Sequence, residues 1–336
     1  MTAPTIYYSD DAGAPVVSQG ADSLYQILRA CLIDGYGSKT AAGWSVVYDD
    51  WATNGVLTIT NALATGILGL KRFNETTYGP GLFVCEAMID SVTPVNARSG
   101  KYGINNLDSL TDSAGYQRAQ FSPDTHTNWV VVANDNTVLF FSGPSSGLYS
   151  AQNQSNGGVA FMAFGALVSG VGVDNDTLGN FAVVGGNHRL SLSSSYSYGL
   201  VGNVGSTSAS IGGGTVFYKD GAIGVGTLPQ LLFPISDQGD QLKFTTRYLP
   251  LAPVSVVQKR QNVSGGSDIG LLPMLFSCRE MSSYNTTVSI LTVQQYFDTS
   301  LMSLRDSITV GGKSLTLCSL GWYSYAFISL DVGDWL

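Results

Sequence analysis

Charged residues are scarce in this chain of 336 residues, where Asp, Glu, Lys and Arg together make up 12% of the sequence, about half the usual share. A domain with so few charges has difficulty keeping a fully wetted surface soluble. We therefore expect neighbouring subunits to cover much of the surface. The formal net charge of -8 provides no basic footprint, which argues against nucleic acid as a partner.

Cysteine and histidine are also scarce, with four and two residues respectively. All the cysteines lie in apolar runs and none forms a C-x-x-C pair: Cys31, Cys85, Cys278 and Cys318. We expect reduced core thiols, as in a protein assembled in a reducing cytoplasm, rather than disulfides. His126 and His188 lie far apart and the cysteines are dispersed, so the sequence predicts no metal site.

Long apolar segments are missing as well. The longest run, Val159 to Val173, contains several glycines and a serine and is shorter than the roughly 20 residues that a membrane helix needs. We therefore predict no membrane span. The first residues, Met1 to Asp11, have no basic start and no apolar centre, so we also expect no secretory signal.

One amphipathic helix is predicted near the start of the chain, within the stretch Ala21 to Trp51. Five apolar residues recur there at helical spacing: Leu24, Ile27, Leu28, Cys31 and Leu32. Asp22 or Ser23 can cap its start, and Gly35 can end it in a left-handed conformation. A loop from Gly35 to Gly43 follows. The alternation of Trp44, Val46 and Tyr48 after it predicts a strand, whose sheet should receive the apolar stripe of the helix.

A helix followed by G-Y-G-S-K-T-A-A-G-W (residues 35–44) resembles a segment of uncharacterised virion structural proteins of tailed bacteriophages. The resemblance covers roughly Ile6 to Phe73 and returns near the end, at Gly270 to Phe276 and at Asp331 to Trp335. It implies a chain made mostly of strands after its first helix. The family provides no catalytic residues to carry over. The resemblance therefore implies that the protein is part of a virion, and it implies no reaction mechanism.

The rest of the chain consists of short β-type runs at regular intervals, a pattern typical of all-β sandwiches and barrels. The predicted strands are Gly55–Thr60, Ile67–Arg72, Leu82–Ile89, Trp129–Ala133, Val138–Ser142, Val159–Leu167, Phe181–Val184, Thr215–Lys219, Gln230–Ile235, Leu242–Tyr248, Val254–Val257, Gly270–Phe276, Val288–Val293, Ser307–Val310, Leu315–Ser319 and Tyr325–Leu330. Asp135-Asn136 and Asp220-Gly221 are predicted hairpin turns. The fold class is therefore mainly β.

Two domains are predicted, with a boundary near Gly221 to Leu228. Residues 1–225 should form the helix packed on β-sandwich-like or barrel-like sheets, and residues 226–336 a small β-barrel-like module. Prolines punctuate the second part, which fits short or edge strands. The last ten residues are rich in large apolar side chains, among them Phe327, Leu330, Val332 and Trp335. We expect this terminus to be docked rather than free.

Several motifs invite a chemical interpretation that their context does not favour. Gly143 to Gly147 satisfies G-x-S-x-G, but a hydrolase needs a strand-to-helix turn there, and only His188 follows as a base. Gly37 to Thr40 resembles part of a phosphate loop, yet a helix precedes it instead of a strand. Asp174 to Asp176 begins like a calcium loop without a closing Glu. We therefore predict no catalytic, cofactor-binding or metal-binding residues.

The run Ser193 to Tyr198 is the remaining candidate, because tyrosines stack on sugar rings and serines supply hydrogen bonds. The same composition is common where subunits meet.

The function we expect is a non-enzymatic structural component of a tailed-phage virion, on the tail side (tail, baseplate, or neck and collar). It would form a homo-oligomer and bind other virion proteins. The alternatives are a minor capsid or head decoration protein, and a tail protein that binds a host receptor or surface glycan.

Overall fold

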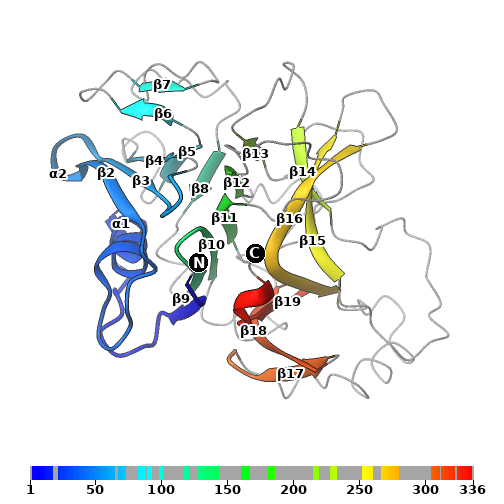
Figure 1. The fold of residues 1–336 in the computed structure, drawn as a ribbon. Helices are drawn as coiled ribbons and strands as arrows, with labels where there is room; N and C mark the ends of the chain where they lie inside the picture. Colours follow the sequence, from blue (N-terminus) through cyan, green and yellow to red (C-terminus); the bar gives the residue numbers. More distant parts are fainter. Residues whose placement is uncertain are drawn as a thin grey trace, which may run out of the picture.

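The computed structural model of the chain (Figure 1) describes residues 2–17, 22–64, 67–72, 82–87, 89–92, 98–100, 117–120, 128–143, 160–166, 181–185, 215–218, 228–232, 252–259, 266–279, 304–310, 312–321 and 324–334. Most of these residues lie in strands of antiparallel sheets, with one short α-helix near the start. The mainly β fold class is therefore confirmed.

The predicted helix is present, and its second half is π-helical. Helix α1 (Asp22–Arg29) passes directly into the π-helical turn η1 (Ala30–Asp34). All five residues of the predicted stripe are fully buried. Gly35 ends the helix at a positive φ of 77°, as expected, but its ψ of 170° lies outside the left-handed region. Its N–H binds the carbonyl of Ala30 (2.8 Å), the spacing of a π-turn, so the helix closes by a wider turn than predicted.

The first sheet has six antiparallel strands in the order β1-β9-β10-β11-β12-β13. Their bounds are β1 (Thr5–Tyr8), β9 (Asn128–Ala133), β10 (Thr137–Gly143), β11 (Ala160–Ala166), β12 (Phe181–Gly185) and β13 (Thr215–Tyr218). Strands β9 to β13 match five predicted strands, and the predicted turn Asp135-Asn136 joins β9 to β10. Strand β1 at the edge was not predicted, and it pairs with β9, which follows it in the sequence by more than a hundred residues.

The second sheet has five antiparallel strands in the order β2-β3-β4-β5-β8. Their bounds are β2 (Ser45–Asp50), β3 (Val56–Thr60), β4 (Ile67–Arg72), β5 (Leu82–Ala87) and β8 (Gln117–Gln120), with the one-turn helix α2 (Trp51–Asn54) after β2. The predicted strand Leu82–Ile89 is divided between β5 and β6 (Ile89–Val92), and β6 pairs with β7 (Arg98–Gly100). In β2 the predicted alternation is broken by a register shift between Val46 and Tyr48.

The third sheet, near the carboxyl terminus, has six antiparallel strands in the order β14-β15-β16-β19-β18-β17. Their bounds are β14 (Leu228–Leu232), β15 (Ala252–Lys259), β16 (Gly266–Arg279), β17 (Ser307–Val310), β18 (Lys313–Gly321) and β19 (Ser324–Ser329), followed by the 3-10 turn η3 (Val332–Asp334). The predicted strands Leu242–Tyr248 and Val288–Val293, the turn Asp220-Gly221 and residues 221–227 of the boundary lie outside the described residues. Closure into a barrel and the division into two domains stay predictions.

Of the apolar residues named for the docking of the carboxyl terminus, the structure describes three, and one of them is buried. Phe327 is buried at 2% exposure, whereas Leu330 and Val332 are 39% and 38% exposed. Trp335 lies outside the described residues. Strand β19 therefore contributes to the core of its sheet, and the described residues after it lie at the surface.

A single core joins the helix to the first two sheets, as the helical stripe predicts. It contains, besides the stripe, residues of the first sheet (Tyr7, Trp129, Val131, Ala133, Val138, Phe140 and Phe164), of the second sheet (Leu57, Ile59, Leu68 and Leu70), and Trp44 and Trp51. Burying one such large apolar side chain contributes roughly 1.5–3 kcal/mol. Apolar burial between helix and sheets is therefore the main stabilising term in this part of the chain.

The first sheet is buried on both faces along β1, β9 and β10 and at Ala163 and Phe164 of β11. The opposite face from the shared core carries Ile6, Tyr8, Val130, Val132, Leu139, Phe141 and Ala163, and all of them are buried. In Figure 1, strands β9 to β12 lie between α1 on one side and β14 to β19 on the other. Burial on both faces explains why β9 and β10 are continuous apolar runs without alternation. Within the described residues no helix is long and apolar enough to cross a membrane.

Candidate functional site

Most of the motifs weighed in the sequence fall where the structure gives no description. Gly143 is the last residue of β10, and residues 144–147 lie outside the described part, as do Asp174 to Asp176, Ser193 to Tyr198, and both histidines, His126 and His188. Among the described residues, no group of three or more His, Cys, Asp or Glu side chains is placed to hold a metal ion.

The cysteines lie in the regular elements that their apolar surroundings predict. Cys31 is in η1 and is a buried free thiol. Burial raises its pKa well above the usual value, and the nearby charge of Asp11 acts in the same direction. Cys85, Cys278 and Cys318 are in β5, β16 and β18. A thiol buried in this way is a core residue and not a reactive group.

The loop that carries the family resemblance forms a tight hairpin of its own. Tyr36 and Lys39 exchange two backbone hydrogen bonds, of 3.1 Å and 2.7 Å. Beyond the hairpin, the amides of Ala42 and Gly43 bind the carbonyls of Cys31 and Leu32 (2.9 and 3.1 Å). The loop is thus folded back onto the end of the helix, and these bonds satisfy carbonyls that the last helical turn would leave without partners.

The other half of the site is the turn after β1. The Tyr8 amide donates to Oδ2 of Asp11 (2.9 Å), and the Asp11 amide donates to the Tyr8 carbonyl (3.1 Å). The Ala14 amide in turn binds the Asp11 carbonyl (3.0 Å). Asp11 therefore shapes this turn through its side chain as well as its backbone, a frequent use of aspartate in turns.

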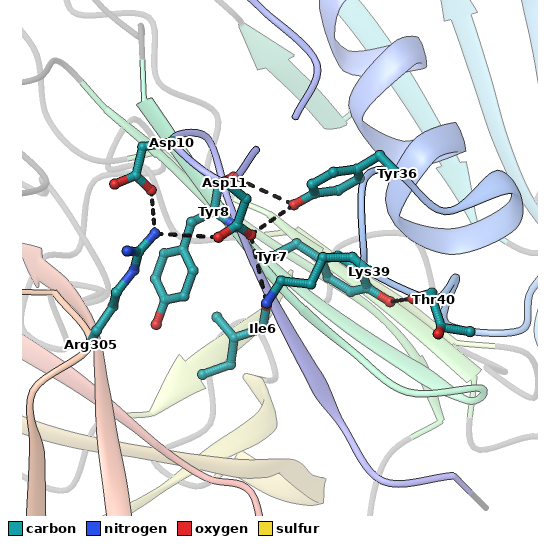
Figure 2. Close-up of polar contacts among 9 residues, drawn as sticks. All are labelled: Ile6, Tyr7, Tyr8, Asp10, Asp11, Tyr36, Lys39, Thr40 and Arg305. Carbon is teal, nitrogen blue, oxygen red and sulfur yellow. Dashed lines mark hydrogen bonds and ion pairs between the residues drawn. The ribbon is translucent and has the colours of Figure 1, made fainter. Parts of the chain in front are cut away.

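The hairpin and the turn meet in what we call the edge junction, formed by Ile6, Tyr8, Asp11, Tyr36 and Lys39 (Figure 2). The Lys39 ammonium donates to the Ile6 carbonyl (2.9 Å) and lies 3.7 Å from Oδ2 of Asp11. The Tyr36 hydroxyl donates to the same Asp11 oxygen (3.1 Å) and lies 3.4 Å from the Tyr8 carbonyl oxygen. The polar groups of the junction are directed at one another and at the backbone of β1.

Two neighbouring contacts fasten the loop further. The Tyr7 hydroxyl donates to the Thr40 carbonyl (2.7 Å) from the core side of β1. Gly37, at a φ of 53°, lies so close to the turn that a Cβ there would be 2.2 Å from the Ala12 carbonyl oxygen. Only glycine permits this approach of the two backbones.

The ionisation of the two tyrosines reflects this enclosed setting. Burial raises the pKa of Tyr7 and of Tyr36 well above the usual tyrosine value. For Tyr36, the nearby Cys31 and Asp11 raise the pKa further. Both phenols therefore stay neutral donors at any physiological pH and are poor candidates for acid–base chemistry.

A second contact reaches the same turn from the carboxyl-terminal sheet. Nη2 of Arg305 pairs with Oδ1 of Asp10 and lies 3.4 Å from Oδ1 of Asp11, while its guanidinium lies 4.2 Å from the centre of the Tyr8 ring (Figure 2). Arg305 has a φ of 85°, which is rare for a residue with a side chain. Arg305, two residues before β17, thus joins two sheets that lie far apart in the sequence.

The helix is anchored to β2 by a further polar cluster. Tyr25 stacks on Trp51 with ring centres 4.7 Å apart, and its hydroxyl donates to Asp49 (2.9 Å). Arg29 pairs with Asp49 and with Asp34. Asp22, which the sequence offers as a helix cap, is the first residue of α1, and its carboxylate accepts a hydrogen bond from the Trp51 indole (2.7 Å), which attaches the helix to α2. All these contacts position secondary structure.

Sequence reasoning missed the half of the site that lies at the start of the chain. Thr5 to Tyr8 is a short β-branched and aromatic run followed by the turn residues Ser9 to Asp11, and this pattern is typical of a strand and its turn. No local signal singles out Arg305, because its contacts depend on how two distant sheets pack. Lys39 was assigned to the loop correctly, but its contact with β1 was not predicted.

Comparison with known proteins identifies no relative. No family model matches the chain, and no curated protein matches it.

Proposed function

We propose that the chain is a non-enzymatic structural subunit of a tailed bacteriophage particle, on the tail side, which acts through contacts with copies of itself and with other virion proteins. The observation that carries the proposal concerns the contacts made by residues 22–51, which lie within the stretch of the resemblance, roughly Ile6 to Phe73. Their helix buries its apolar stripe, and Tyr36 and Lys39 of their loop bind the turn and backbone of β1. This stretch serves to build a subunit, which is the role that the resemblance implies.

The composition supports a subunit whose surface is largely covered. Charged residues are few, at 12%, and apolar side chains such as Val16 and Leu63 are 82% and 59% exposed. Isolated exposed apolar residues are ordinary, but together with a low surface charge they favour association. A symmetric oligomer is therefore part of the proposal. Dynamic light scattering at micromolar concentration tests it, and a stable monomer would contradict it.

The direct test is to locate the chain in particles of the phage that carries its gene. Purified particles would be separated into tails and heads, and each fraction probed with an antibody against the chain and by mass spectrometry. We expect the chain in the tail fraction, with gold-labelled antibody at the tail, baseplate or neck. Its presence only in heads would replace this proposal with a minor capsid or decoration protein. Its absence from particles would overturn both.

Binding to a host glycan or receptor is a separate outcome of the same experiment. Intact tails and the purified chain would be incubated with host cells and with isolated surface polysaccharide. Retention of the chain together with labelling at the tail tip would identify a receptor-binding protein. We expect no retention, because the described polar groups that the resemblance singles out are engaged within the subunit.

A further inference from the structure

Strand β1 has one side that pairs with β9 and one side that faces away from the sheet. The Ser9 amide binds the Trp129 carbonyl (3.0 Å), which fixes which residues point toward β9. The backbone groups of successive residues alternate in direction in an antiparallel pair. The N–H and C=O groups of Tyr7 therefore also point toward β9, whereas those of Ile6 and Tyr8 point outward. These outward groups are the ones that a strand of another molecule would use.

The edge junction pairs three of these four outward groups, with side chains and with the backbone of the turn after β1. The Ile6 carbonyl accepts from Lys39, the Tyr8 amide donates to Asp11, and the Tyr8 carbonyl accepts from the Asp11 amide and faces the Tyr36 hydroxyl. Each of these partners comes from the turn after β1 or from the hairpin after the helix. Three of the four outward backbone groups of Ile6 and Tyr8 are therefore already bonded within the molecule.

We propose that Asp11, Tyr36 and Lys39 form an edge guard, which prevents β1 from pairing with β1 of a second copy of the chain. An open edge strand is a template for pairing with another chain. The sequence of β1, Thr-Ile-Tyr-Tyr, is uncharged and consists of β-branched and aromatic residues, the composition that promotes strand association. A second copy is the expected partner because it presents the same strand.

The guard is held in place by contacts that do not involve the edge itself. Gly37 allows the hairpin to lie directly on the turn, and the Arg305 guanidinium holds the second oxygen of Asp11. Strand β1 is the end strand of its sheet, and Ile6, Tyr7 and Tyr8 are 8% or less exposed, so its outer edge, which the edge junction covers, is the side on which another strand could pair. The inference does not depend on the particle in which the chain works.

The test is a double variant, Tyr36→Phe with Lys39→Met, which keeps the ring and the aliphatic stem and removes the donors. Light scattering should detect association beyond the oligomer of the unaltered chain, at a concentration at least about tenfold lower in the double variant than in the unaltered chain, since tenfold corresponds to the free energy of roughly one hydrogen bond. Hydrogen exchange in peptide 2–14 should be faster in the dilute variant and slow again on association.

Two control variants separate the edge guard from simpler explanations. Lys313→Met removes an equal charge and adds an equal apolar side chain at an exposed position on β18. Leu28→Ala destabilises the core without touching the junction. We expect both to associate less than the double variant. The proposal is overturned if either associates as strongly, if the double variant associates no more than the unaltered chain, or if association leaves peptide 2–14 unprotected.

Discussion

Two contacts reach the turn after β1, and they differ in almost every physical respect. The hairpin of residues 36–39 comes from nearby in the sequence, and its Lys39 side chain is 31% exposed. Arg305 comes from the carboxyl-terminal sheet, and its side chain is 48% exposed with a partner, Asp10, that is 58% exposed. Both contacts use Asp11, whose side chain is 16% exposed.

The difference indicates which contact stabilises the fold and which only joins its parts. Hydrogen bonds to backbone groups at a half-buried site survive salt, because water does not compete freely for them. An exposed ion pair contributes about 0–1 kcal/mol and is screened by salt. The hairpin is therefore an integral part of the fold around the first sheet, whereas Arg305 is a weak link between two sheets. The following predictions test this distinction, from the largest expected effect to the smallest.

The apolar attachment of the helix should outweigh the polar attachment of its loop. Leu28→Ala removes a fully buried side chain and should lower the free energy of unfolding by about 2–5 kcal/mol, because it leaves a cavity. Lys39→Ala should cost less, since it removes one backbone hydrogen bond and a partly exposed charge. Denaturant unfolding of both variants measures the difference. A larger loss for Lys39→Ala would mean that the junction, and not the core, dominates.

The close approach of hairpin and turn should be sensitive to a single methyl group. Gly37→Ala places a Cβ against the Ala12 carbonyl, and moving the two backbones apart should cost about 1–3 kcal/mol. Gly312→Ala is the matched control, because Gly312 has a similarly positive φ of 83° but no atom within 4 Å of its Cβ position. Equal losses in the two variants would show that backbone strain, and not the contact, is responsible.

Alkaline pH should lower the free energy of unfolding through Tyr7 and Tyr36, the two tyrosines that hold the hairpin loop. The pKa of Tyr7 and Tyr36 is raised in the folded state, so the unfolded chain loses these protons first as the pH passes the usual tyrosine value of about 10. The folded state then binds more protons than the unfolded state, and stability falls as the pH rises.

Tyr36→Phe isolates this effect. It should cost about 1 kcal/mol at neutral pH, because it removes the hydroxyl that donates to Asp11, and it should flatten the decline in stability above pH of about 10. Unfolding followed in denaturant between neutral and alkaline pH measures both. A decline as steep in Tyr36→Phe as in the unaltered chain would assign the alkaline sensitivity to other groups.

The Arg305 contact should give the smallest change. Arg305→Ala should lower stability by no more than about 1 kcal/mol in low salt, and by less in high salt. Arg305→Gly removes the same contacts but also relieves the positive φ, so it should be more stable than Arg305→Ala. A loss that is unchanged by salt, or a Gly variant less stable than the Ala variant, would show that Arg305 holds the sheets together more firmly than its exposure implies.

The sequence by itself determined the elements whose signals are local. The spacing of Leu24, Ile27 and Leu28 predicts the helix and its buried face, because a helix brings residues three and four positions apart onto one side. The short apolar runs and the turn Asp135-Asn136 predict β9 and β10 for the same reason, since strand and turn propensities act over a few residues.

Only the tertiary structure decided which elements meet. β1 pairs with β9 across more than a hundred residues, Lys39 binds the Ile6 carbonyl, and Arg305 reaches Asp10 from the other end of the chain. The partners in each of these pairs are too far apart in the sequence for hydrophobic periodicity or turn propensity to predict their contact. They follow from how the buried faces of the sheets pack, because that packing sets which polar groups are left at the edges to be paired.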